Sequence, residues 1–135
     1  MKPKSSKSPD AQSEGLEKQG KRVPAIFYRT EAGGEPVRDW LKGLLPDDRK
    51  RIGEDIKTVE FGWPVGMPVC KPLGEGIYEA RTSLAQNRSA RVLFYIDKKD
   101  RMVLLHGLIK KTQKTPDEDL ALARSNKNKH QRGLQ

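Results

Sequence analysis

The segment MVLLHGLIKKTQKTPDED, residues 102–119, constrains the fold of this chain more than any other part. It begins with an apolar run that predicts a buried strand, and it passes without a loop into a cationic segment. A helix start follows at once, because Thr115 is a good N-cap, Pro116 suits the first helical position and Glu118 completes a T-x-x-E capping box. The strand thus brings three amines to the end of a sheet, those of Lys110, Lys111 and Lys114. This arrangement favours binding or cleaving a phosphate backbone over binding a neutral small molecule.

The composition excludes several other classes of protein. A formal net charge of +9 over 135 residues indicates one domain with a polyanionic partner. Cys70 is the single cysteine, so an intramolecular disulfide is excluded, and with no signal peptide in view we expect a cytoplasmic protein. No apolar run approaches the roughly 18 residues that a membrane span needs, and no spacing of ligands suggests a metal or a cofactor.

The chain divides into three predicted parts. Residues 1–22 form a basic tail that we expect to be disordered, residues 23–126 form the folded domain, and residues 127–135 form a frayed polar end. Within the domain we predict a strand over 23–30, helices over 35–45 and 46–62, a long loop over 63–76, strands over 76–84, 89–97 and 101–111, and a helix from 116 to about 125. The order is β-α-α-β-β-β-α.

This order predicts an α+β fold, a small and mostly antiparallel sheet with two helices packed on one face. Trp40 lies on an apolar helical stripe and is expected to pack in the core. Strand alternation puts Glu79 and Arg81 on one side of their strand, and the polar side of the next strand carries Arg91. These side chains could line an open face of the sheet, with His106 or Lys111 nearby.

The region from residue 72 to residue 116 resembles one family. The strings LGEGIYEAR, RVLFY and LLHGLIKKTQKTP are similar to those of the phage-derived branch of HigB-type toxins, within the RelE/ParE superfamily. The resemblance covers roughly residues 25–124, and Leu108 stands where the family usually has phenylalanine. The family's fold, a small sheet with two helices on one face, agrees with the order of elements predicted above.

The resemblance implies a toxin of a type II toxin–antitoxin system. Such toxins cleave mRNA on the ribosome, in the A site of the 30S subunit, and so arrest translation. The cleavage needs no metal: the 2′-OH of one nucleotide attacks the adjacent phosphate and leaves a cyclic phosphate and a 5′-OH. The partner would be a cognate antitoxin, by analogy a small helix-turn-helix protein.

The resemblance also implies roles for individual residues. Arg81 matches the family arginine that stabilises the phosphorane, for which a planar guanidinium is well suited. Arg91 matches a second family arginine, but an ion pair with Glu79 would explain it too. Glu79 is a candidate general base, with the same ion pair as the alternative. His106 is a candidate acid or base, or a histidine packed in an apolar strand.

The remaining candidates are lysines. Lys111 is expected to act in catalysis by stabilising charge, or as an acid or base if its pKa is lowered. We expect the phosphate backbone to be bound by Arg91 and by three further lysines, Lys71, Lys110 and Lys114.

Two other functions fit the same sequence. One is a non-enzymatic gyrase poison similar to the ParE proteins, which would share the fold and differ only in the residues of the open face. The other is an inactive, basic, phage-derived protein that binds nucleic acid with strong salt dependence and does not cleave it.

Overall fold

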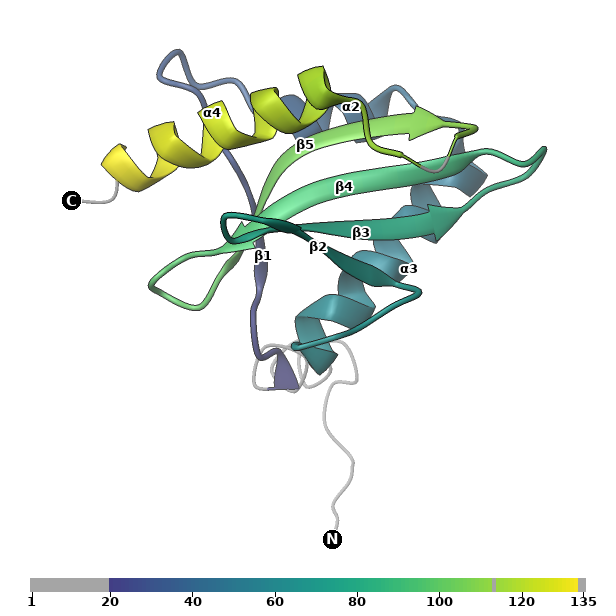
Figure 1. Ribbon diagram of the computed structural model, residues 1–135, viewed down its shortest axis with the longest axis horizontal. Helices are drawn as coiled ribbons and strands as arrows, with labels where there is room; N and C mark the ends of the chain where they lie inside the picture. Colours follow the sequence, from purple (N-terminus) through teal and green to yellow (C-terminus); the bar gives the residue numbers. More distant parts are fainter. Residues whose placement is uncertain (1–19, 113, 134–135) are drawn as a thin grey trace, which may run out of the picture.

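The computed structural model describes residues 20–112 and 114–133, and within them three helices and five strands (Figure 1). The predicted disorder of the tail falls on residues 1–19, which lie outside the described part of the chain. The α+β class is confirmed. In chain order the elements are β1 (Ala25–Phe27), α2 (Pro36–Lys42), α3 (Pro46–Gly62), β2 (Cys70–Gly74), β3 (Ile77–Ser83), β4 (Ser89–Ile96), β5 (Met102–Lys110) and α4 (Asp117–Gly133).

The strands form one mostly antiparallel sheet in the order β1-β5-β4-β3-β2. The meander of β3, β4 and β5 is antiparallel, as its short connections predict, and β1 joins the far edge of β5 in parallel. The prediction of an unstructured loop over residues 63–76 was wrong in part, because β2 lies within it and pairs with β3. Pro72 and Gly74 interrupt the alternation of apolar and polar residues by which a strand is recognised in a sequence. An edge strand tolerates both, and the pairing shifts register between them.

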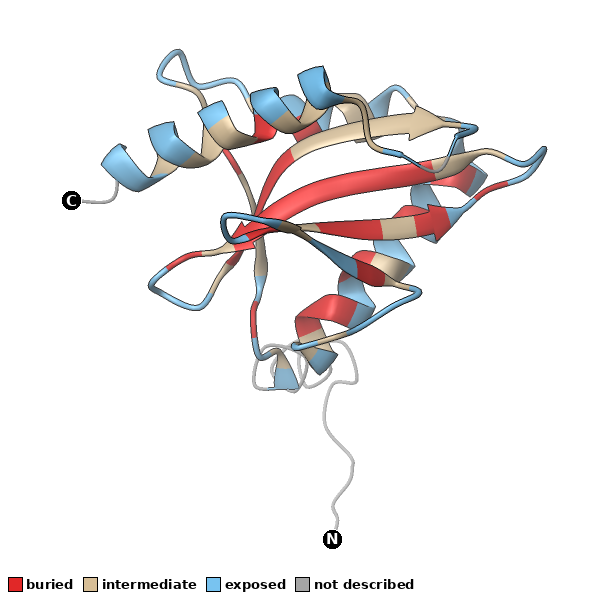
Figure 2. Ribbon diagram, in the orientation of Figure 1, coloured by how far each residue is buried: buried red, intermediate tan, exposed pale blue. Residues whose placement is uncertain are grey.

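The helices α2 and α3 cover one face of the sheet, as predicted. Ile52, Ile56 and Val59 of α3 are buried in the core that includes Val92 and Phe94 of β4. β4 is buried along almost its whole length (Figure 2). This central position holds the strands of the candidate site rigidly in place.

Trp40 of α2 packs against the same core, which confirms its predicted structural role. Its indole ring lies so close to β5 that a Cβ atom on Gly107 would stand 2.4 Å from the ring atom Cε3. Only a glycine therefore allows this contact.

The opposite face of the sheet is not open along its whole length, which corrects the expectation above. The long helix α4 packs across β5 and β4 there, with Ala123 and Leu120 facing inward. The reason is the apolar character of this face, where Leu93, Val103 and Leu105 are fully buried and would otherwise contact water. A polar site can therefore lie on the part of this face that α4 does not cover, next to the segment that leads into the helix.

Helix α4 runs to Gly133 and so continues through the region that the sequence predicts to be frayed. Three contacts attach its second half to the rest of the domain. Asn126 donates to the carbonyl of Leu105 at 2.9 Å, Lys127 donates to the carbonyl of Glu75 at 2.6 Å, and His130 Nδ1 lies 2.5 Å from the Tyr95 hydroxyl. No helix in the described part of the chain is both long and apolar enough to cross a membrane.

Candidate functional site

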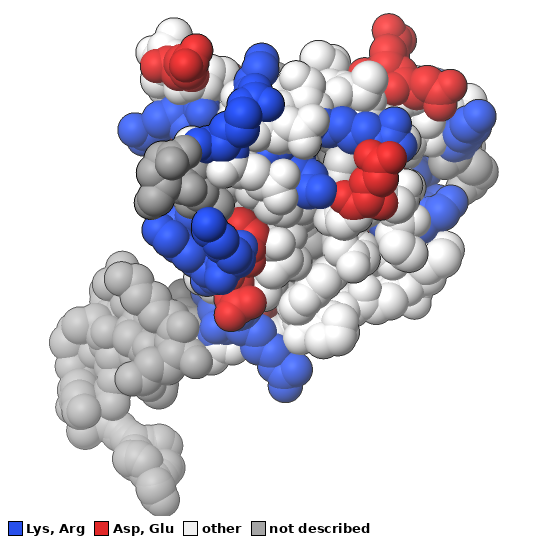
Figure 3. All heavy atoms as spheres, turned by 60° about the vertical axis from the view of Figure 1, so that its left-hand side comes forward, with Lys and Arg blue, Asp and Glu red and all other residues white. Residues whose placement is uncertain are grey.

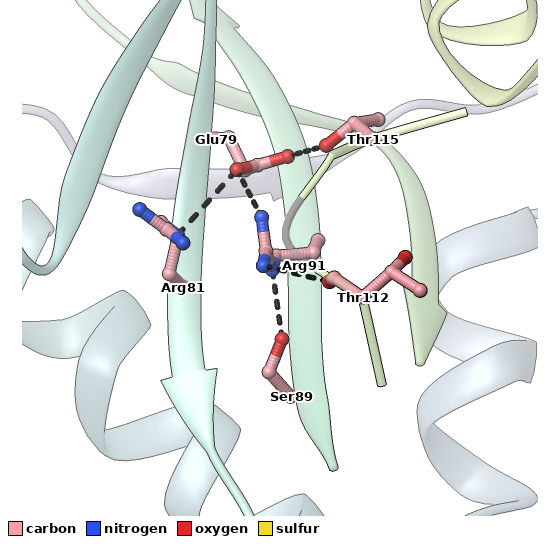
Figure 4. A network of polar contacts seen from close by, with 6 residues as sticks. All are labelled: Glu79, Arg81, Ser89, Arg91, Thr112 and Thr115. Carbon is pink, nitrogen blue, oxygen red and sulfur yellow. Dashed lines mark hydrogen bonds and ion pairs between the residues drawn. The ribbon is translucent and has the colours of Figure 1, made fainter. Parts of the chain in front are cut away.

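Glu79 is the centre of a network of polar contacts between β3, β4 and the segment that leads into α4 (Figure 4). The residue is 0 % exposed. Arg91 lies on the neighbouring strand, and its Nη1 atom donates to Glu79 Oε1 at 2.6 Å. Arg91 is itself 2 % exposed. The ion pair is therefore almost completely removed from water, and each charge depends on the other.

The remaining donors of Arg91 hold its guanidinium in one orientation. Nε donates to the hydroxyl of Ser89 at 2.9 Å, and Nη2 donates to the carbonyl oxygen of Thr112 at 3.4 Å. The hydroxyl of Thr115 donates to the second oxygen of Glu79. The segment after β5 is thus attached to the network at two points. Helix α4 begins at Asp117, one residue later than predicted. Pro116, and not the predicted N-cap Thr115, accepts the first helical hydrogen bond, from the Leu120 amide at 3.1 Å, and the Thr115 hydroxyl contacts Glu79 instead.

Arg81 lies next to this network and reaches the surface. Its Nε atom is 3.7 Å from Glu79 Oε1, and its side chain is 20 % exposed. Register places it directly opposite Arg91, so the two guanidinium groups project from the same face of the sheet. Glu79 therefore orients Arg81 from below while the guanidinium stays accessible to a ligand.

A hollow of about 540 Å³ opens beside Arg81. Its walls come from the ends of β3 and β4, from α3, and from the start of the segment after β5. The cationic residues that line it are Arg51, Arg81, Arg91 and Lys111, and the acidic ones are Glu54 and Asp55. The hollow is wide enough for a nucleotide phosphate, and its wall on α3 carries both carboxylates together with Arg51.

Lys110, the last residue of β5, is placed differently from its neighbour Lys111. Its Nζ atom is shielded from solvent and has no hydrogen-bond partner among the described residues. Burial lowers the pKa of this amine from its ordinary value, and the positive charge of Arg91 lowers it further. Lys110 is therefore not an ordinary surface lysine, although the sequence predicts only a phosphate contact there.

The other predicted residues are scattered around the network. Lys111 is exposed and lines the hollow, whereas Lys71 on β2 and Lys114 are exposed without being among its lining residues. His106 Nε2 lies 2.6 Å from Asp119 Oδ1, which ties β5 to the first turn of α4. The structure thus favours the structural alternatives for Glu79 and Arg91, and it gives His106 a specific polar partner outside the hollow.

Sequence reasoning missed the contribution of α3 to the site. Arg51, Glu54 and Asp55 lie on the outer side of a helix that we expected only to cover the sheet. From the sequence, these residues can be placed outside the apolar stripe of the helix, but nothing indicates that they line a site. The roles of Ser89 and Thr112 were missed for the same reason, because a single serine or threonine carries no pattern.

Both basic and acidic side chains occur near the site and elsewhere on the surface. On the face shown in Figure 3, Lys and Arg side chains are interspersed with Asp and Glu. No group of three or more His, Cys, Asp or Glu side chains in the described part of the chain could hold a metal ion. What the site offers is a guanidinium and an ammonium at the rim of a hollow, held in position by a buried ion pair, and this arrangement suits an anion with several oxygens.

Comparison with known proteins places most of the chain in one family. Residues 39–128 match the family described as phage-derived protein Gp49-like (DUF891), and the match spans α3, all strands but β1, and most of α4. None of the curated proteins compared with the chain matches it significantly.

Proposed function

We propose that this chain, which belongs to the Gp49-like family of RelE/HigB-like toxins, is the toxin of a type II toxin–antitoxin system and cleaves mRNA on the ribosome. The observation that carries the proposal is the position of Arg81, which lines the hollow together with Lys111 and is oriented by the buried Glu79. We place the substrate in the A site of the 30S subunit. The outcome would be arrest of translation in the cytoplasm.

The proposed reaction is metal-independent and is a transfer within the RNA backbone. The 2′-OH of one nucleotide loses its proton as its oxygen attacks the adjacent phosphorus, and the bond from phosphorus to the 5′-oxygen breaks. The leaving 5′-oxygen takes up a proton, so the products are a cyclic phosphate and a 5′-OH. The phosphorane in between carries more negative charge on its oxygens than the diester. Arg81 donates two parallel N–H groups to these oxygens, and Lys111 adds a second positive charge at the rim of the hollow.

Glu79 and Arg91 act behind the reacting atoms. Because Arg91 neutralises Glu79, the carboxylate can orient Arg81 without adding a net negative charge near the phosphate. The attachment of Thr112 and Thr115 to the same pair fixes the segment that carries Lys111. Preorganisation of this kind lowers the barrier because the cations need not move as charge develops.

The proposed partner in the inactive state is a cognate antitoxin, a small helix-turn-helix protein. It would prevent cleavage by keeping mRNA or the ribosome away from the hollow. Arg81 and Lys111 then mark the surface whose access it controls.

The test is inducible expression in a bacterium, with primer extension on an abundant mRNA. Wild type should arrest growth and produce new cuts, and Arg81→Ala should lose both while keeping its fold. A reduction of about a hundredfold or more in cleavage is expected from loss of a charged donor to the transition state. Lys99→Ala, an exposed lysine in the turn after β4, is the matched control and should cleave like wild type.

The alternatives give different results. Growth arrest without cuts, together with trapped gyrase, would support a poison similar to the ParE proteins. No arrest, with salt-dependent binding to RNA, would support an inactive binding protein. Full cleavage by Arg81→Ala would remove Arg81 from the mechanism.

A further inference from the structure

The amine of Lys110 can carry a positive charge, but it forms no hydrogen bond with any described residue. Its Nζ atom is cut off from solvent, and among the described residues it has no hydrogen-bond partner. A buried ammonium without a partner is costly, because it loses its hydration and gains no compensating bond. The described part of the resting site therefore offers this amine no hydrogen bond.

The charged groups around Lys110 do not form a hydrogen bond with its amine. From β3 it faces Glu79 and Arg81, from β4 Arg91, and from α4 Asp119. Glu79 already receives Arg91 and Thr115, and Asp119 already binds His106. The two arginines repel an ammonium. The carboxylates near Lys110 are thus engaged elsewhere.

Lys110 does not itself line the hollow, but its neighbours do. Arg81 and Arg91 both face Lys110 and both line the hollow, and Lys111, the following residue in the chain, lines it as well. A phosphate bound to these cations would bring anionic oxygens close to an amine that has no hydrogen-bond partner among the described residues. The four rotatable bonds of a lysine side chain allow its nitrogen to meet them.

We propose that Lys110 is a proton-linked phosphate ligand: its amine takes up a proton from solvent as a backbone phosphate enters the hollow, and it then donates to that phosphate. This inference rests on the proposed function for the nature of the ligand. The phosphate stabilises the ammonium that the empty site disfavours, so binding and protonation reinforce each other. Affinity for RNA should accordingly fall as pH rises through the range in which free Lys110 loses its proton.

The linkage predicts a titration that sets Lys110 apart from the other lysines. Its shift is downward from the ordinary value because burial disfavours the charged form, with Arg91 as the second cause. The first measurement is an NMR titration of the free protein with labelled lysine ε-carbons, and the Lys110 signal is assigned by its loss in Lys110→Met. This measurement needs neither RNA nor catalysis.

The second measurement is calorimetric binding of a short 2′-O-methyl RNA oligonucleotide, which cannot be cleaved and whose phosphodiesters do not titrate between about pH 7 and 10. Buffers of different ionisation enthalpy report the protons taken up. Wild type should take up a fraction of a proton per oligonucleotide. Lys110→Met should take up less and bind about tenfold more weakly, since a hydrogen bond to a charged group is lost.

Three variants separate this role from a structural one. Lys110→Arg keeps a permanent charge and should bind without proton uptake. Lys111→Met should weaken binding and leave proton uptake intact. Lys99→Met, in the exposed turn at the other end of the β4–β5 pair from Lys110, should change neither. Thermal unfolding checks each fold, and Lys110→Met should be at least as stable as wild type because it removes a buried, unpaired amine.

The outcomes are distinct from those of the growth assay. Titration of Lys110 together with the other lysines would overturn the inference whatever the protein does to RNA. RNA binding without proton uptake, or with the same uptake in Lys110→Met, would also overturn it and would leave the proposed nuclease standing. Proton-linked binding without mRNA cleavage in cells would support the inference and refute the nuclease.

Discussion

Replacing Arg91 by methionine should strongly destabilise the domain, because it leaves the carboxylate of Glu79 buried and without its main partner. The two groups are 2.6 Å apart, with residue exposures of 2 % for Arg91 and 0 % for Glu79. Removing one partner of a buried ion pair costs about 3–5 kcal/mol. Since whole domains are stable by only about 5–15 kcal/mol, this loss is a large fraction of the total.

Urea unfolding followed by tryptophan fluorescence measures the effect. At an m-value of about 1–3 kcal/mol/M, the midpoint should fall by roughly 2 M with little change in m. The matched control is Arg38→Met, which removes an exposed ion pair. Arg38 Nη1 lies 3.3 Å from Glu35 Oε1, but its side chain is 54 % exposed. Its loss should cost about 0.5 kcal/mol.

A double variant tests the reason for the loss. In Glu79→Leu with Arg91→Met, no buried charge is left unpaired at this pair, so the double variant should be more stable than Arg91→Met alone. A loss below about 1 kcal/mol in Arg91→Met, close to that of Arg38→Met, would refute the reasoning. The same would follow if the double variant were no more stable than the single one, since the cost would then come from packing.

Two further predictions concern the two faces of the sheet, one covered by α2 and α3 and the other by α4. Gly107→Ala should destabilise the domain by about 1–3 kcal/mol, because the added methyl group overlaps the ring of Trp40. Gly53→Ala, in an open part of α3, should instead stabilise the domain by about 0.5–1 kcal/mol. Urea unfolding of both variants measures the two effects, and equal effects would contradict the prediction. Burial lowers the pKa of His130 below its ordinary value of 6.5, so the unfolded state binds more protons and the unfolding free energy should fall as pH drops below about 6.5. His130→Gln can still accept a hydrogen bond from Tyr95 but does not titrate, so the stability difference between wild type and this variant should vary between about pH 5 and 8, and a constant difference would refute the linkage.

The strongly periodic elements were the most predictable. Helix α3 begins at Pro46 and ends at Gly62, as its proline, first-turn aspartates and apolar stripe indicate. The ends of β3, β4 and β5 were within one residue of the prediction. In each case a regular alternation of apolar residues stands between turn residues, and such patterns report burial directly. Strand β2 lacks this pattern because it pairs on one side only, and it was missed.

The sequence predicted that three residues of the candidate site share one face of the sheet, but it did not predict how the site is organised. Alternation placed Glu79, Arg81 and Arg91 on one face, and the pairing of β3 with β4 confirms it. Which arginine is buried and which is exposed depends on what covers the face. Helix α4 and the segment before it bring Thr115 and Thr112 over Glu79 and Arg91, and they leave Arg81 at the hollow.

Local patterns along the chain were sufficient to predict the α+β class, the strand order of the meander and the basic end of β5, because each follows from the properties of residues close together in sequence. Only the tertiary structure shows that Arg91 and Glu79 are almost fully buried. It also shows that the amine of Lys110 is shielded from solvent whereas Lys111 is exposed. Burial and charge pairing arise between segments far apart in the chain, here β3, β4, α3 and the start of α4. The chemistry of each side chain is set by those neighbours, and their positions exist only once the sheet and helices have packed.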